Sequence, residues 1–118
     1  MKKESFILVH AGSQPAPEVI QLDPDHLLDG MYRAIRCDCI EIVRVQTGLL
    51  LPYGVVLVVD ESGWFHEPVL INRLATVWYS DVIPGNVILA AEGYRNGESD
   101  LVGLNDFQLK YLRDAFGI

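Results

Sequence analysis

Two adjacent polar residues, Asn72 and Arg73, are the first candidates for a binding site, because they directly follow the apolar residues 69–71. An arginine offers a planar fork of donors that suits a carboxylate or a phosphate, and an asparagine adds a donor and an acceptor. Trp64 and His66 precede them and complete the predicted ligand-binding set. The structural alternative is that Arg73 fastens a turn by bonding backbone carbonyls or an acidic residue.

The histidines are candidates for acid–base chemistry. A small hydrolase or transferase that uses His66 or His10 with an acidic partner is therefore the alternative to a binding protein. His26 follows Asp23 and Asp25, which have ligand chemistry. Their spacing does not match that of zinc sites, and a helix cap explains the aspartates, so we predict no metal.

The two cysteines, Cys37 and Cys39, are separated by one residue and do not form a Cys-x-x-Cys redox motif. A disulfide between them would be strained, so we expect two free thiols. Asp60 and Glu61 are paired carboxylates, but their place beside a glycine is typical of solvent-facing turn residues. Phosphate-loop, dinucleotide and nucleophile-elbow motifs are absent from the sequence, so we assign no cofactor and leave catalytic residues unknown.

Aromatic residues form a second candidate surface. If they cluster, they could stack a nucleobase or contact a protein partner, since aromatic side chains supply much of interface energy. Ordinary packing is the alternative, and we favour it for Trp78. The residues concerned are Trp64, Phe65, Trp78, Tyr79 and Tyr94.

Charge and hydropathy limit the function classes. The net charge is −7, from 16 acidic and 9 basic residues in 118, and the basic residues form no stripe. Nucleic-acid binding depends on neutralising phosphates, so we predict no nucleic-acid partner. Half of the residues are hydrophobic, yet no apolar run is long enough for a signal peptide or a membrane span. We therefore expect a cytoplasmic protein without membrane contact.

The expected strands must position these residues. The strand over 54–60 is apolar on both faces, which is typical of a strand covered on both sides. A polar loop is expected over 94–100, and 71–79 fits either a helix or an extended chain. The remaining strands are predicted over 6–9, 18–22, 40–47 and 86–91.

Two helices are expected. The first begins at Asp23 and Pro24, an acidic cap with proline just inside, and carries apolar residues at helical spacing up to Ile35. The second begins at Asn105, with Gln108 at the capping-box position. The sequence thus predicts a single α+β domain over 1–118, with a small mixed or antiparallel sheet packed by two helices. Unpaired strand edges in such a sheet also invite a homodimer.

Several short motifs resemble, in their order, a known family. They are the turn Glu61–Gly63, the segment Leu70–Arg73, the strand 85–91 and the helix start Leu104–Gln108. The family consists of uncharacterised small proteins encoded largely by bacteriophages and other mobile elements of bacteria. The resemblance covers most of residues 5–116 and implies no established activity. It implies an accessory protein that binds a host protein or a small anionic ligand, with interference in host defence as one concrete form.

Overall fold

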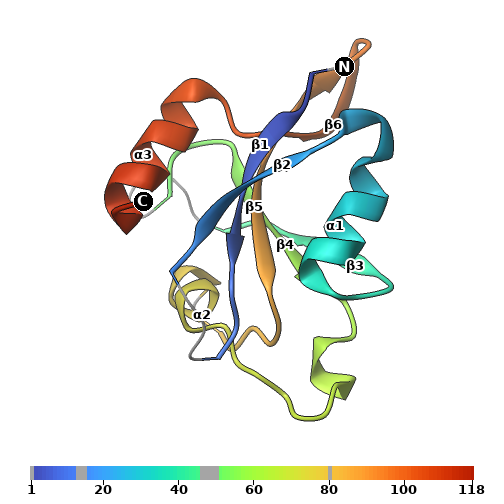
Figure 1. Cartoon of the computed structure of the whole chain (residues 1–118), viewed down its shortest axis with the longest axis vertical. Helices are drawn as coiled ribbons and strands as arrows, with labels where there is room; N and C mark the ends of the chain where they lie inside the picture. The colour runs from blue at the N-terminus through green and yellow to red at the C-terminus, as the bar shows by residue number, and fades with distance from the viewer. Residues whose placement is uncertain (1, 13–15, 46–50, 80) are drawn as a thin grey trace.

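The computed structural model describes residues 2–12, 16–45, 51–79 and 81–118 (Figure 1). These residues form six strands and three α-helices, joined in part by two short 3-10 turns. In chain order the elements are β1 (Glu4–Val9), β2 (Glu18–Leu22), η1 (Pro24–His26), α1 (Leu27–Ile35), β3 (Ile40–Val43), β4 (Val55–Asp60), η2 (Gly63–Phe65), α2 (Arg73–Tyr79), β5 (Val87–Arg95), β6 (Glu98–Val102) and α3 (Asp106–Phe116).

The strands form one antiparallel sheet in the order β2-β1-β5-β4-β3. Strand β5 is long enough to pair with β1 through its first half and with β6 through its second half. Leu89 lies at the centre of the sheet, opposite Ile7 of β1 and Leu57 of β4. The predicted α+β class is confirmed, with an antiparallel sheet and one helix more than expected.

Helices cover both faces of the sheet (Figure 1). Because strand side chains alternate between faces, each strand contributes to two separate cores. All six residues of β4 are buried, which confirms the predicted strand with two covered faces. The core on the side of α2 and α3 includes Ile7, Val9, Leu57, Val59, Ala75, Leu89 and Leu112. The core on the side of α1 includes Phe6, Leu8, Met31, Ile35, Val56, Val58 and Ile88.

The first helix begins as the sequence predicts. Asp23 accepts a hydrogen bond from the backbone N–H of Asp25 at 2.9 Å, and Pro24 opens the 3-10 turn that leads into α1. This cap accounts for Asp23 without a metal ion. Met31 and Ile35 then face the sheet and are buried, so the end of α1 is held firmly against β1 and β5.

The last helix also begins as predicted. Asn105 and Gln108 form a reciprocal capping box, and the Gln108 side chain donates to the Tyr53 carbonyl oxygen at 2.8 Å. On α3, Leu112 is buried against the sheet, whereas Phe107 is 71 % exposed. None of the helices in the described ranges is long and apolar enough to cross a membrane.

The polar loop predicted over 94–100 is wrong. Strand β5 continues to Arg95, β6 starts at Glu98, and the two form a tight hairpin. Asn96 and Gly97 connect them with φ angles of 52° and 80°. Positive φ at both central residues is the turn geometry that an Asn-Gly pair favours, and this pair was the signal for the hairpin.

Two other segments are settled in part. Residues 73–79 form the helix α2, which resolves the choice between helix and extended chain. The strand expected over 40–47 ends at Val43, and its last two residues lie outside the described ranges. Strand β3 lies at one end of the sheet order. The homodimer expected from an unpaired strand edge stays a prediction.

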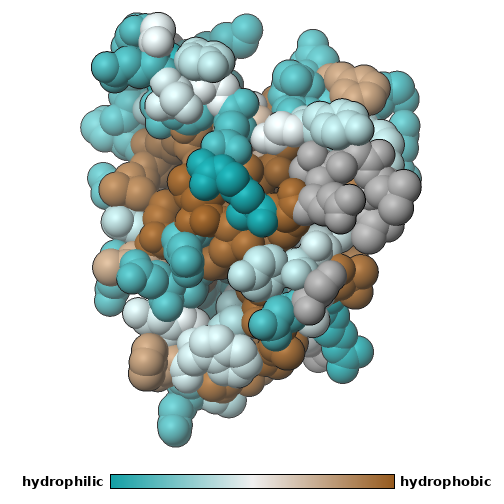
Figure 2. Space-filling model, turned by 180° about the vertical axis from the view of Figure 1, so that it is seen from behind, coloured by the Kyte–Doolittle hydropathy of each residue, from teal (hydrophilic) through white to brown (hydrophobic). Residues whose placement is uncertain are grey.

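The side of the molecule that faces away from the viewer in Figure 1 carries both apolar and hydrophilic surface (Figure 2). Figure 2 shows apolar surface across the middle of this side, with hydrophilic side chains lying over it. Ile42 of β3 is partly exposed. Arg44 and Glu92 form an exposed ion pair, with Nη2 and Oε2 2.6 Å apart, that joins the chain after β3 to β5.

Candidate functional site

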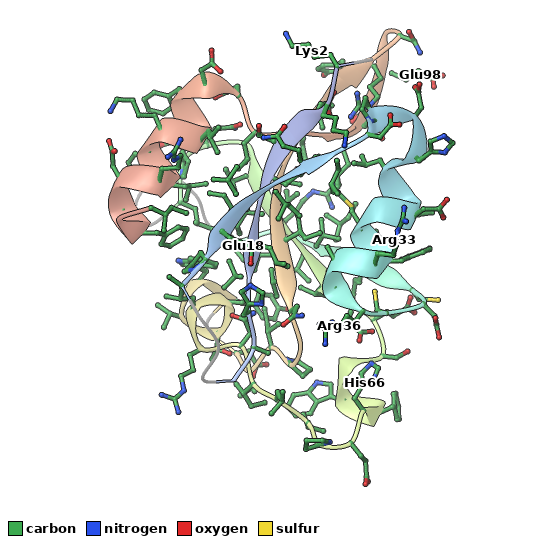
Figure 3. The ribbon with its side chains drawn as sticks, in the orientation of Figure 1. Lys2, Glu18, Arg33, Arg36, His66 and Glu98 are labelled. Atoms are coloured by element: carbon green, nitrogen blue, oxygen red, sulfur yellow. The ribbon has the colours of Figure 1, made fainter. Side chains whose placement is uncertain are left out.

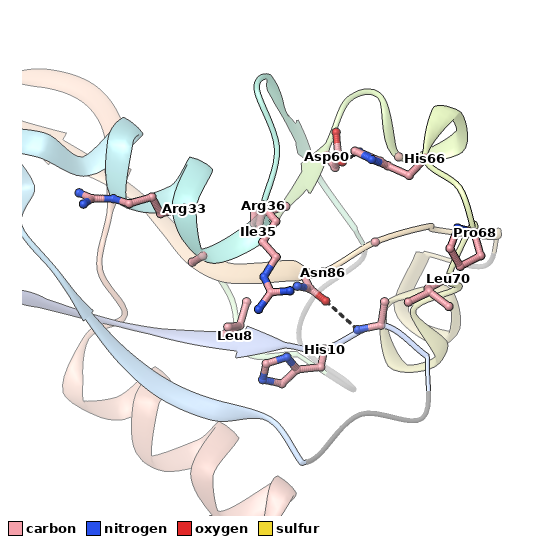
Figure 4. A pocket seen from close by; sticks show the side chains of 14 residues that line it. Leu8, His10, Arg33, Ile35, Arg36, Asp60, His66, Pro68, Leu70 and Asn86 are labelled. Carbon is pink, nitrogen blue, oxygen red and sulfur yellow. Dashed lines mark hydrogen bonds and ion pairs between the residues drawn. The ribbon is translucent and has the colours of Figure 1, made fainter.

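A pocket of about 450 Å³ lies between the end of α1, the end of β1 and the chain that follows β4 (Figure 4). Apolar residues form part of its wall and include Leu8 of β1, Ile35 of α1 and Leu70 of the chain between η2 and α2. The polar residues that line it are His10, Arg33, Arg36, Asp60, His66 and Asn86. The pocket therefore combines an apolar wall with a group of hydrogen-bonding side chains, as small-molecule sites commonly do.

An aspartate–histidine pair lies at the edge of the pocket. Asp60 is the last residue of β4 and its side chain is 4 % exposed. One carboxylate oxygen accepts the backbone N–H of Ser62 at 2.9 Å, and the other lies 2.6 Å from Nε2 of His66. The tight turn after β4 passes through Gly63, where a Cβ would lie 2.9 Å from a Pro84 side-chain atom. The turn returns His66 toward the end of the strand and thereby forms the pair.

A second histidine has a similar arrangement. His10 directly follows β1, and its Nε2 lies 2.7 Å from Oε2 of Glu18, the first residue of β2. Since a carboxylate accepts, Nε2 carries the hydrogen in both pairs and Nδ1 is the second polar atom of each ring. Both histidines line the same pocket, so the two rings considered for acid–base chemistry share one site.

Arg36 supplies the positive charge of the pocket. It caps α1 in the left-handed conformation, with φ 67°, and its backbone N–H bonds the Tyr32 carbonyl at 2.8 Å. Its side chain is exposed and forms no ion pair with any residue in the described ranges. In Figure 4 it reaches toward Asn86 and His10, whereas Arg33 points away along α1. Figure 3 places Arg36 between α1 and His66.

The Asn86 side chain is oriented by the backbone. Its Oδ1 accepts the N–H of Ala11 at 2.9 Å, so the acceptor end of the amide is occupied. The NH₂ end has no acceptor among the described residues. Arg36 and Asn86 thus present donors without acceptors to the same space.

Asn72, predicted to contact a ligand, does not line the pocket and is fully buried. Its Nδ2 donates to the carbonyl oxygens of Val9 at 2.9 Å and Gly85 at 3.0 Å. Its Oδ1 accepts the N–H of Ala75 at 3.1 Å, at the start of α2. Asn72 therefore joins β1, the Gly85 turn and α2, and it holds in place the segments that carry His10 and Asn86.

The other predicted ligand-binding residues differ in whether they reach the pocket. His66 lines the pocket, as described, but Arg73 and Trp64 do not. Arg73 is exposed at the start of α2 and forms no hydrogen bond or ion pair within the described chain. Trp64 is 55 % exposed on η2. The structure brings none of the three residues Asn72, Arg73 and Trp64 to the pocket. Ligand contacts by them stay predictions.

The five aromatic residues considered as a surface do not stack on one another. Trp78 instead packs against Phe116 of α3, with ring centroids 5.9 Å apart, which confirms ordinary packing for that residue. Phe65 and Tyr94 are strongly exposed and lie on different elements, η2 and β5.

The two cysteines are free thiols, as expected. Burial, and next the negative charge of Asp60, raise the pKa of the Cys37 thiol to about 11. Cys37 is therefore protonated at neutral pH and is a poor nucleophile. The described residues include no group of three or more His, Cys, Asp or Glu side chains placed to hold a metal ion.

Three pocket residues were not among the site residues predicted from the sequence. Asp60 was interpreted as solvent-facing, and this was wrong because the turn folds back and covers it. Arg36 lies one turn after Arg33, which was a detectable basic pair, but nothing in the sequence showed that a helix cap would aim it at a pocket. Asn86 follows the Pro84–Gly85 turn, and its role depends on a contact with Ala11, 75 residues away in the chain.

Comparison with known proteins gives a family and no activity. A family model described as a domain of unknown function, DUF3846, matches residues 1–117. No curated protein and no solved structure matches the chain. The match confirms the part of the resemblance that predicted an uncharacterised domain family. The chain therefore belongs to the DUF3846 family.

Proposed function

We propose that this protein binds a small anionic ligand in the pocket beside Arg36. The observation that carries the proposal is that the Arg36 guanidinium and the Asn86 amide present donors to one pocket without an acceptor among the described residues. Donors in such a position are satisfied by water or by a ligand, and an anion satisfies a guanidinium best. Arg36 places a positive charge in this pocket on a protein whose net charge is −7.

Asp60 is the main opposing charge, and its effect is reduced by its own contacts. Both of its oxygens are occupied, by the Ser62 N–H and by His66. A ligand in the pocket therefore meets a carboxylate that is already hydrogen-bonded, beside an exposed guanidinium that has no ion pair in the described part of the chain.

The test is a calorimetric titration of wild type, Arg36→Gln and Arg73→Gln with inorganic phosphate, sulfate and acetate. Loss of a charge-assisted hydrogen bond costs about 1.5–3 kcal/mol, so Arg36→Gln is expected to weaken binding about 10- to 100-fold. Arg73→Gln is the matched control, since it removes an exposed arginine outside the pocket. Unchanged affinity in Arg36→Gln, with loss in Arg73→Gln, would move the site to α2.

A second candidate is a small hydrolase or transferase, and the His66–Asp60 pair favours it. A buried carboxylate that holds one ring nitrogen of a histidine orients the ring for proton transfer through the other nitrogen. The discriminating measurement is release of p-nitrophenol from ester and phosphate-ester substrates by wild type and His66→Gln. Turnover that disappears in His66→Gln supports an enzyme, and ligand binding without turnover supports a binding protein.

The biological setting belongs to the same proposal. An origin in a phage or mobile element, and action against host defence, rest on the sequence resemblance given above. A host protein is the alternative partner, and the exposed aromatic residues Phe65 and Tyr94 are candidates for contacting it. Native mass spectrometry of the protein purified from its host separates a retained small molecule from a retained protein.

A further inference from the structure

The pocket presents donors from two parts of the chain, the Arg36 cap of α1 and Asn86 before β5, and this feature bears on the class of anion. The Arg36 guanidinium alone satisfies a carboxylate, because its planar fork matches the two oxygens of that group. The pocket offers a second donor group from another part of the chain: the Asn86 NH₂ group, directly before β5. A carboxylate that binds the Arg36 fork through both oxygens has no third oxygen for this second donor group, whereas a phosphate monoester has one.

We infer that the ligand is a phosphate ester and that the Asn86 amide binds the phosphate oxygens that Arg36 does not. This inference rests on the proposed function. A phosphate monoester carries three terminal oxygens in a tetrahedral arrangement, so it accepts hydrogen bonds from directions outside the guanidinium plane. The fixed amide of Asn86 supplies further donors, because its Oδ1 is held by the Ala11 N–H at 2.9 Å and its NH₂ group is left for a ligand.

The rest of the pocket fits the organic part of an ester. Leu8, Ile35, Pro68 and Leu70 line it with apolar surface, which bare phosphate would not use. Its volume of about 450 Å³ exceeds the needs of an inorganic ion and falls in the range of small-molecule sites. The ligand class is thus a phosphate attached to a compact, partly apolar group.

The test compares three probes that share a phenyl group: phenyl phosphate, phenylacetate and phenol. Each is titrated into the whole chain labelled with ¹⁵N, and affinity is taken from chemical-shift changes. Phenyl phosphate is expected to bind at least about tenfold more tightly than phenylacetate, since it engages one more charge-assisted donor. Phenol is expected to bind more weakly than either anion.

Asn86→Asp is the decisive variant. It keeps an oxygen for the Ala11 N–H and replaces the donor NH₂ by a carboxylate oxygen, so the fold is retained while a phosphate is repelled. We expect about 100-fold weaker phenyl phosphate binding. Asn96→Asp makes the same chemical change on the β5–β6 turn, outside the pocket, and is expected to leave affinity unchanged.

The outcomes separate the two proposals. Equal or tighter binding of phenylacetate, or unchanged phosphate affinity in a folded Asn86→Asp protein, overturns the phosphate-ester inference and leaves an anion-binding pocket. Binding of neither anion overturns the proposed function as well. Preferred phosphate binding that Asn86→Asp removes and Asn96→Asp does not supports both.

Discussion

Asp60 and His66 lie six residues apart in the chain, and Nε2 of His66 is 2.6 Å from Oδ2 of Asp60, whose side chain is 4 % exposed. The carboxylate is buried and bonded twice, whereas the imidazole is half exposed at the pocket edge. The pair therefore links the end of strand β4 to the chain segment after η2 that lines the pocket.

Replacement of this carboxylate is expected to cost stability. Asp60→Asn keeps an oxygen for the Ser62 N–H but loses the charged acceptor of His66, so the free energy of unfolding should fall by about 1–3 kcal/mol. Urea unfolding measures it, with Asp29→Asn as control for an exposed aspartate on α1. Equal stability in the two variants would show that the pair does not hold the segment.

Asn72 is expected to be a structural residue, and its replacement should lower the free energy of unfolding more than the other substitutions. Asn72→Ala leaves two buried carbonyls and one backbone N–H without their partners, which should cost at least about 3 kcal/mol of unfolding free energy. Arg73→Ala changes the next residue, which is exposed, and should stay within about 0.5 kcal/mol of wild type. Thermal or urea unfolding of both variants measures these changes in the free energy of unfolding. A small loss in Asn72→Ala would contradict its role in joining three elements.

The thiol at Cys37 is expected to react slowly. Because burial and the charge of Asp60 raise its pKa to about 11, the reactive thiolate is scarce at pH 7 and increases as the pH approaches 11. Alkylation by iodoacetamide, followed by peptide mass spectrometry at several pH values, compares it with exposed Cys39 in the same chain. Asp60→Asn should accelerate the reaction of Cys37. Equal alkylation rates for the two thiols at neutral pH would contradict a raised pKa of the Cys37 thiol.

The ion pair between Glu4 and Arg95 should make stability depend on acid pH. The hydrogen bond from Arg95 lowers the pKa of Glu4 most strongly, and the Gly103 N–H lowers it further against the effect of burial. Because the folded-state pKa lies below the unfolded one, the contribution is complete above the unfolded value and is lost as the pH falls through the folded value.

Glu4→Gln removes this dependence and should lower the free energy of unfolding at pH 7 by about 2 kcal/mol. Denaturant unfolding of both proteins from neutral to acid pH measures it. The two stability curves should converge at low pH. A constant gap between the curves at every pH would mean that Glu4 acts through packing and not through its charge.

The fold was largely predictable because its signals are local or periodic. The apolar residues of β4 indicated two covered faces, and the Asn105–Gln108 capping box fixed the start of α3. The Asn96–Gly97 hairpin carried an equally local signal, which the polar residues around it obscured. The antiparallel order needed the structure, since it depends on pairings such as Ile7 with Leu89 that are distant in sequence.

The candidate site was predictable only through His66 and His10. The Asn72–Arg73 pair suggested a solvent-facing site, but the tertiary structure directs Asn72 inward to three backbone groups and leaves Arg73 outside the pocket. Arg36 and Asn86 meet because a helix end and a strand start converge on the pocket. A single sequence gives no signal for such convergence.

The most direct test of the central claim is a ¹⁵N NMR titration of the whole chain with phenyl phosphate, read residue by residue. We expect the largest shifts around the pocket, at residues 8–11, 34–37, 60–70 and 85–86, and the loss of these shifts in Arg36→Gln. Shifts confined to α2 around Arg73, or the absence of shifts at saturating probe, would contradict an anion-binding pocket beside Arg36.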